Sequence, residues 1–144
     1  MSIFYRLLNP AMNCLLRSPA HRIISWRVMS LEYRGRRSGR AFATPVSYYR
    51  DGDVVYCFTN GAWWHNFERE HPVVARIAGR SYRGSGLAAP ATDEPNVHIM
   101  ARYFTAVPAD AKFYGVRFGE DGRATLDSVR RAAQHMVMIR IRLH

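Results

Sequence analysis

Residues 35–46, GRRSGRAFATPV, are the stretch from which the fold prediction starts. Two glycines enclose Arg36, Arg37 and Ser38, and an apolar strand pattern begins directly after Arg40. Glycine permits a sharp turn and lets backbone N–H groups approach a ligand closely. Arginine offers a planar fork that binds phosphate or carboxylate through two parallel bonds. The stretch therefore predicts a loop between two strands that holds an anion. The alternative is an exposed hairpin tip in an arginine-rich chain.

The residues on either side of this loop predict short strands joined by tight turns. A strand over 28–33 leads into the loop, and strands over 42–50 and 53–58 are joined by Asp51-Gly52, a strong hairpin signal. A second hairpin is expected over 73–78 and 81–88. In the last strand, alternation places Val137, Ile139, Ile141 and Leu143 inward and Met138, Arg140 and Arg142 outward.

Helical spacing of apolar residues occurs at the start, in the middle and near the end of the chain. Helices are expected within residues 1–26 and over 63–70, 92–107 and 124–134, with a loop around Phe113, Tyr114 and Phe118. This order predicts one α+β domain over residues 1–144. Its core is a closed or split β-barrel of about six mostly antiparallel strands with flanking helices. Residues 1–26 are expected to pack on the barrel as a helical segment, and peripheral membrane contact through that segment stays open as the alternative.

Charge and composition narrow the classes of partner. The 144 residues carry a formal net charge of +10, which implies an anionic partner: a nucleic acid, a membrane surface or a polyanionic small molecule. Cys14 and Cys57 lie in apolar surroundings and are expected to be buried thiols. No cysteine or histidine spacing is typical of a metal site, so we expect no metal. No apolar run is long enough to span a bilayer and the first residues do not resemble a signal peptide, so the cytoplasm is the expected location.

The segments LEYRGRRSGRAFATPVSYYRDGDVVYCFTN, WWHNF and HPVVARIAGRSYRGSG, in this order, carry a family resemblance over about residues 18–86. Together they resemble the deazaflavin (coenzyme F420)-dependent nitroreductase and quinone reductase family, within the split-barrel flavin-binding superfamily. The resemblance implies a cofactor-binding set that comprises Arg36, Arg37, Ser38, Gly39 and Arg40 at the phosphate, Thr44, Pro45 and Val46 under the ring, and Trp64 and Asn66 beside it. From the residues alone, Pro45 is equally an edge-strand proline, and paired tryptophans are commonly core anchors.

The same resemblance implies an enzyme in which reduced F420 gives a hydride to a quinone, a nitro compound or an activated double bond. Tyr48 and Tyr114 are the candidates for the substrate side of the site, where a proton donor is needed. FMN is the alternative cofactor, because it also needs a basic phosphate loop. A nucleic-acid-binding basic domain and a non-catalytic carrier of cofactor or lipid are the competing functions, and a homodimer stays open. The chain has no helix-turn-helix, zinc-finger or RNA-recognition signature.

Overall fold

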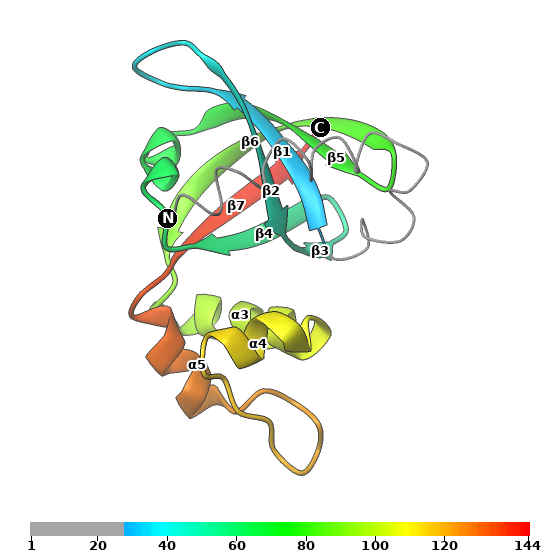
Figure 1. The fold of residues 1–144 in the computed structure, drawn as a ribbon, viewed down its shortest axis with the longest axis vertical. Helices are drawn as coiled ribbons and strands as arrows, with labels where there is room; N and C mark the ends of the chain where they lie inside the picture. The colour runs from blue at the N-terminus through cyan, green and yellow to red at the C-terminus, as the bar shows by residue number, and fades with distance from the viewer. Residues whose placement is uncertain (1–27) are drawn as a thin grey trace.

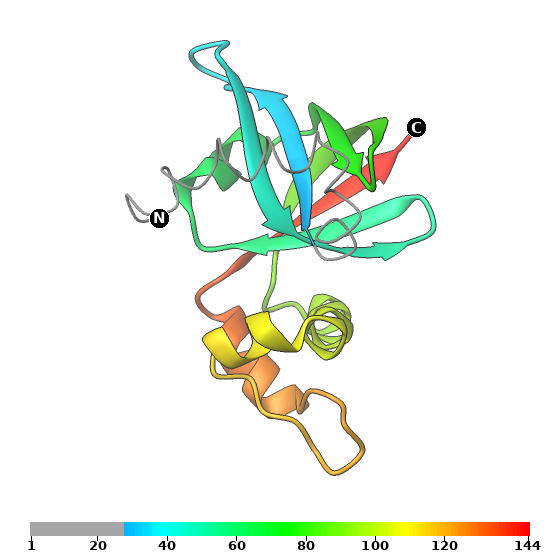
Figure 2. The same ribbon diagram turned by 45° about the vertical axis from the view of Figure 1, so that its right-hand side comes forward.

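The computed structural model describes residues 28–144 (Figures 1 and 2), so the helical segment expected over residues 1–26 and Cys14 lie outside the described residues. The strands and helices, in chain order, are β1 (Val28–Arg34), β2 (Ala41–Ser47), β3 (Tyr49–Asp51), β4 (Val54–Thr59), the 3₁₀ helix η1 (Ala62–Phe67), β5 (His71–Ile77), β6 (Arg80–Pro90), α3 (Glu94–Ala106), α4 (Pro108–Phe113), α5 (Leu126–Ala133) and β7 (Val137–Leu143). In this part of the chain no helix is long and apolar enough to cross a bilayer.

The strands form one seven-stranded sheet in the order β2-β1-β5-β6-β7-β4-β3, and every neighbouring pair is antiparallel. The sheet curls into an open barrel, with the helices α3, α4 and α5 gathered below it in Figure 1. This arrangement confirms the α+β split barrel expected from the sequence.

The strand expected over 42–50 is wrong, because the chain breaks it at Tyr48 into two strands. β2 pairs with β1, with Val46 opposite Met29, whereas β3 pairs with β4, with Tyr49 opposite Tyr56. The two pieces therefore form the two edges of the sheet. A continuous pattern of strand-forming residues cannot reveal this break. It arises because the sheet curls until its two edges come close together, so that two consecutive segments of the chain can belong to opposite edges.

Alternate residues of the strands fill the inside of the barrel. The buried residues of this inner cluster are Met29, Leu31, Tyr33, Val55, Cys57, Phe67, Val73, Ala75, Ile77, Ile139, Ile141 and Leu143. Cys57 is a free, buried thiol, as expected, and its burial raises the pKa of the thiol to about 12.

A second cluster lies between the sheet and the helices. It contains Val97, Met100 and Phe104 of α3, Val129 of α5 and residues of the sheet. Met138 belongs to it and is fully buried, although it lies on the outer face of β7 as the alternation predicts. The alternation of β7 is as expected, with Arg140 and Arg142 exposed, but the helices cover the outer face where Met138 lies. Alternation assigns a residue to a face of a sheet and cannot say what covers that face.

The loop expected around Phe113 contains a further short helix, α4, which begins at Pro108 directly after α3. Proline suits the first helical position because its missing N–H would have no helical partner there. The buried Tyr103 of α3 donates its hydroxyl hydrogen to the Asp110 carboxylate of α4. Burial and the Asp110 charge raise the pKa of Tyr103, so the phenol stays protonated and joins the two helices.

Candidate anion-binding site

The arginine-rich residues 35–40 form the loop between β1 and β2, which projects from one end of the barrel (Figure 1). The Gly35 N–H donates to the Arg40 carbonyl and the Gly39 N–H donates to the Gly35 carbonyl, each at 2.8 Å. Gly39 has a φ of 69°, a conformation that side chains disfavour. The Ser38 hydroxyl oxygen accepts from the Arg40 N–H at 3.2 Å. The loop is thus closed by its own backbone, as the glycine spacing predicts.

A side chain from η1 holds this loop in place. Asn66 accepts from the backbone N–H of Arg36 at 3.0 Å through its side-chain oxygen, across 30 residues of sequence. Its side-chain nitrogen donates to the Trp63 carbonyl at 2.9 Å. Both ends of the amide are therefore used within the chain, and Asn66 fastens the arginine loop to η1.

The end of η1 also brings a carboxylate to the loop. Arg36 Nη1 lies 2.7 Å from Glu68 Oε2, and His65 Nδ1 lies 2.6 Å from Glu68 Oε1. The hydrogen bonds from His65 and Arg36 hold the pKa of Glu68 below its usual value. All three side chains are partly exposed, so these pairs orient the groups more than they stabilise the fold.

The loop and η1 together enclose a cavity of about 630 Å³, which we call the arginine cavity. It is lined by Gly35, Arg36, Arg37, Ser38, Phe42, His65, Asn66 and Glu68. Four residues of the expected cofactor set, from two separate segments, thus share one cavity. Within residues 28–144, the guanidinium groups of Arg37 and Arg40 form no hydrogen bond or ion pair. Free guanidinium groups beside a closed glycine loop suit a phosphate or a carboxylate.

An aromatic row extends from this cavity into the barrel. The ring of Phe42 stacks on Tyr33 with centroids 5.7 Å apart, and Tyr33 stacks on Trp63 at 5.9 Å. Phe42 stays 42% exposed, so one end of the row is open. Gly35 makes room for it, because a Cβ there would lie 3.0 Å from Phe42 Cε2. The indole N–H of Trp63 is buried and has no acceptor within the described residues.

Gly39 and Arg40 belong to the arginine loop but do not line the arginine cavity, and the other expected members lie in β2 and η1. Thr44 and Pro45 are buried in β2, where the Thr44 hydroxyl lies 3.3 Å from that of Tyr33, and Val46 packs against the inner cluster. Trp64 stacks on His65 with centroids 3.9 Å apart. β2 is an edge strand, and Pro45 lies opposite Ser30.

The two tyrosines expected on the substrate side pack against different clusters. Tyr48 packs against the inner cluster, and Tyr114 packs against the second cluster, between the sheet and the helices. Burial is the main cause that raises the pKa of each phenol; Asp110 adds to it for Tyr114, whereas Arg50 opposes it for Tyr48. Tyr48 follows the far end of β2, roughly 20 Å along the strand from the arginine loop at about 3.4 Å per residue. Tyr48 and Tyr114 thus lie against different clusters of the described chain.

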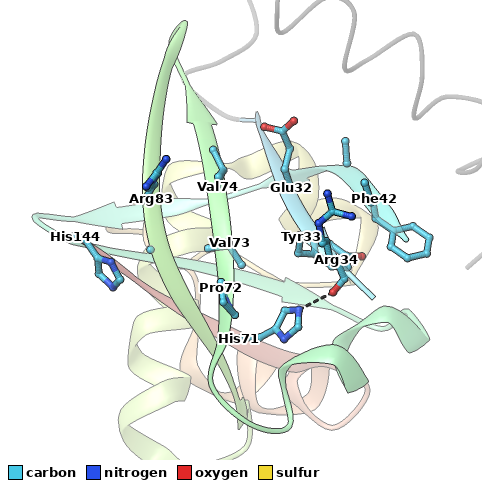
Figure 3. Close-up of a pocket in the computed structure, with 13 residues that line it drawn as sticks. Glu32, Tyr33, Arg34, Phe42, His71, Pro72, Val73, Val74, Arg83 and His144 are labelled. Carbon is cyan, nitrogen blue, oxygen red and sulfur yellow. Dashed lines mark hydrogen bonds between the residues drawn. The ribbon is translucent and has the colours of Figure 1, made fainter. Parts of the chain in front are cut away.

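A second cavity of about 810 Å³ lies on β1, β2, β5 and β6 (Figure 3). Apolar residues such as Ala43, Pro72 and Val74 line it, together with the charged Arg34 and Arg83. His71 Nε2 donates to the Arg34 carbonyl at 2.6 Å, the dashed line of Figure 3, and so ties β5 to the end of β1. Phe42 lines this cavity as well as the arginine cavity.

Four residues that line the arginine cavity lie outside the expected cofactor set: Gly35, Phe42, His65 and Glu68. The spacing of His65 and Glu68, three residues apart in a short helix, is the one signal that indicates their pairing. Nothing in the sequence indicates that Glu68 reaches Arg36, which is 32 residues away. Among the described residues, no group of three histidine, cysteine, aspartate or glutamate side chains is placed to hold a metal ion.

Comparison with known proteins supports the fold. No family model and no curated protein sequence matches the chain. A candidate pyridoxamine 5′-phosphate oxidase from Listeria innocua has a similar structure, with a TM-score of 0.52, 17% identity and coverage of 95% of this chain and 94% of that one. The heme storage protein HutZ from Vibrio cholerae gives a TM-score of 0.54 at 10% identity, with coverage of 95% and 90%. A structure described as an F420 reductase gives 0.44 at 14% identity, with 92% of each chain covered, which is too distant to carry an argument. The chain thus shares the split-barrel fold of these two structures.

Proposed function

We propose that this protein is a reductase that binds coenzyme F420, with its phosphate in the arginine cavity. The observation that carries the proposal is that Arg36, Arg37, Ser38 and Asn66, which the family resemblance assigns to the cofactor, line one cavity although they come from two segments. FMN is the alternative cofactor, since it too carries a phosphate and a flat ring. The likeness to a candidate pyridoxamine phosphate oxidase is compatible with either cofactor.

The residues present suit a phosphate-bearing ring system. Arg37 lines the arginine cavity and Arg40 lies in the same loop outside the lining, and neither guanidinium group has a partner among the described residues. Gly35 leaves room for the ring of Phe42, whose exposed side offers a stacking surface next to the loop. Charge-assisted hydrogen bonds contribute about 1.5–3 kcal/mol each. Two or three of them supply much of the roughly 8 kcal/mol that micromolar affinity requires.

In this proposal the residues of the chain bind and orient the cofactor and supply a proton to the acceptor. When bound in its reduced form, the cofactor supplies a hydride to an electrophilic quinone, nitro group or activated double bond. Asn66 holds the loop so that Arg37 and Ser38 stay in the cavity. The Tyr48 phenol, whose pKa is raised above its usual value by burial, is protonated at neutral pH and can donate to an acceptor bound near the end of β2.

Fluorescence titration with F420 tests the proposal on the native chain and on the Arg37→Ala/Arg40→Ala variant. We expect the double substitution to weaken binding by at least about tenfold, since each charge-assisted bond contributes about 1.5–3 kcal/mol. Both side chains lack partners among the described residues, so the thermal unfolding midpoint should stay unchanged.

The matched control is Arg117→Ala/Arg123→Ala, which removes two exposed guanidinium groups from the loop between α4 and α5, far from the arginine loop in Figure 1. This control should bind F420 like the native chain. Equal weakening in both double variants would mean that net charge, and not the arginine cavity, attracts the ligand. Absence of F420 and FMN binding by the native chain would overturn the proposed function.

A further inference from the structure

The arginine cavity contains a negative charge beside its positive ones. Arg36 and Arg37 bring two guanidinium groups, and the Glu68 carboxylate offsets one of these charges. His65 lies against Glu68 through Nδ1, which donates to the carboxylate. The chain has a formal charge of +10, so the negative Glu68 side chain differs in sign from most of the charges around it.

Glu68 is held in the cavity by both of its oxygens. Oε2 lies 2.7 Å from Arg36 Nη1 and Oε1 lies 2.6 Å from His65 Nδ1. Its lowered pKa keeps the carboxylate charged. A ligand oxygen that approaches Arg36 therefore meets a guanidinium group whose charge is already compensated, and any second negative charge on that ligand is repelled by Glu68.

We propose that Glu68 is a specificity determinant that adjusts the arginine cavity to a singly charged phosphodiester in preference to a doubly charged phosphomonoester. A phosphodiester brings one negative charge, which the guanidinium of Arg37, unpaired within residues 28–144, can match. A terminal phosphomonoester carries about −1.5 to −2 at neutral pH, so part of its charge faces the Glu68 carboxylate. The proposal rests on the proposed function only in placing a phosphate group in this cavity, and it names the class of phosphate.

The test uses two small probes that differ in charge and lack any flavin ring: methyl phosphate, which is doubly charged at about pH 8, and dimethyl phosphate, which is singly charged. Backbone amide NMR shifts of residues 35–40 and 66–68 report binding to the native chain and to Glu68→Gln. We expect the native chain to bind dimethyl phosphate at least as tightly as methyl phosphate. In Glu68→Gln the ratio of the two affinities should shift toward methyl phosphate by at least about fivefold, because the repelling charge is gone.

Glu120→Gln is the matched control, since it removes the same charge from an exposed residue in the loop between α4 and α5. This variant should keep the native ratio, and native-like amide spectra should show that both variants fold. An unchanged ratio in Glu68→Gln, the same change in Glu120→Gln, or no shift of the loop amides by either probe would each overturn the inference.

If the ratio changes as expected but F420 and FMN do not bind, the proposed function fails while the selectivity of the cavity stands. If F420 binds and the ratio does not change, only the role of Glu68 fails.

Discussion

Asn66 shows what can and cannot be predicted for a single residue. The W-W-x-N pattern assigns this amide to the cofactor, and the structure does place it in the arginine cavity. Its oxygen and nitrogen, however, bond to the Arg36 N–H and the Trp63 carbonyl. Sequence spacing identified the neighbourhood of the residue, because the short helix is local. It could not identify the partner, because Arg36 comes from a loop 30 residues earlier.

Cys57 leads to a prediction about pH at the same scale. The pKa of this thiol rises from 9.0 to about 12 in the folded chain because burial disfavours the thiolate. Above about pH 9 the unfolded chain loses this proton first, so the free energy of unfolding should fall between about pH 9 and 12, by at most about 1.4 kcal/mol per pH unit from this group. Denaturant unfolding of the native and Cys57→Ala proteins from pH 8 to about 10.5 measures this fall in the free energy of unfolding.

The difference between the two stability curves removes the contribution of the other titrating groups, apart from that of Tyr33, whose pKa Cys57 helps to raise. Cys57→Ala should be less stable at pH 8, through the smaller side chain, and should lose less stability as the pH rises. Parallel curves over this range would show that the thiol ionises with its ordinary pKa in the folded protein.

Among the elements, the strands were easier to predict than their connections. Both expected hairpins form, but each turn lies one residue away from the expected pair. Asp51 pairs with Val54, so the first turn is Gly52-Asp53, and Ile77 pairs with Arg80, so the second is Ala78-Gly79. Gly52 and Gly79 have φ of 61° and 78°, which suits tight turns. The break at Tyr48 and the burial of Met138 were not predictable. Each depends on a partner distant in sequence: the opposite edge of the sheet for Tyr48, and the packed helices for Met138.

The pairing of β6 with β7 depends on a close approach at Gly84. A Cβ at this position would lie 2.5 Å from the Arg142 carbonyl oxygen, which is backbone and cannot rotate away. Gly84→Ala should therefore push the two strands apart and lower the free energy of unfolding by about 2 kcal/mol or more, within the range for overpacked cores. Chemical denaturation measures this loss.

Ser85→Ala is the neighbouring control, because it removes only a 3.2 Å hydrogen bond to the exposed Glu70. We expect this variant to lose less than about 1 kcal/mol. A Gly84→Ala protein as stable as Ser85→Ala would mean that β7 can shift without cost.

For the whole molecule, the formal charge of +10 admits both a small anionic ligand and a nucleic acid. The salt dependence of the binding affinity distinguishes these two classes of ligand. A protein that contacts six to ten DNA phosphates loses about 10³–10⁵ in affinity between 50 and 200 mM salt, whereas F420 held by two or three guanidinium groups should lose less than about a hundredfold. Titrations with F420 and with duplex DNA over this range provide the measurement. Tight DNA binding that persists near physiological salt and falls steeply above it would favour the nucleic-acid class.

The sequence by itself determined the class of fold, the closed loop at residues 35–40 and the basic character of the chain, because these follow from local turn chemistry, alternation and composition. The tertiary structure alone decided which side chains meet. Glu68 reaches Arg36, Phe42 stacks on Tyr33, and Tyr48 and Tyr114 pack against separate clusters. Such contacts depend on how the sheet curls and where the helices dock. Nothing in the sequence near one residue of a contact indicates which distant residue is its partner.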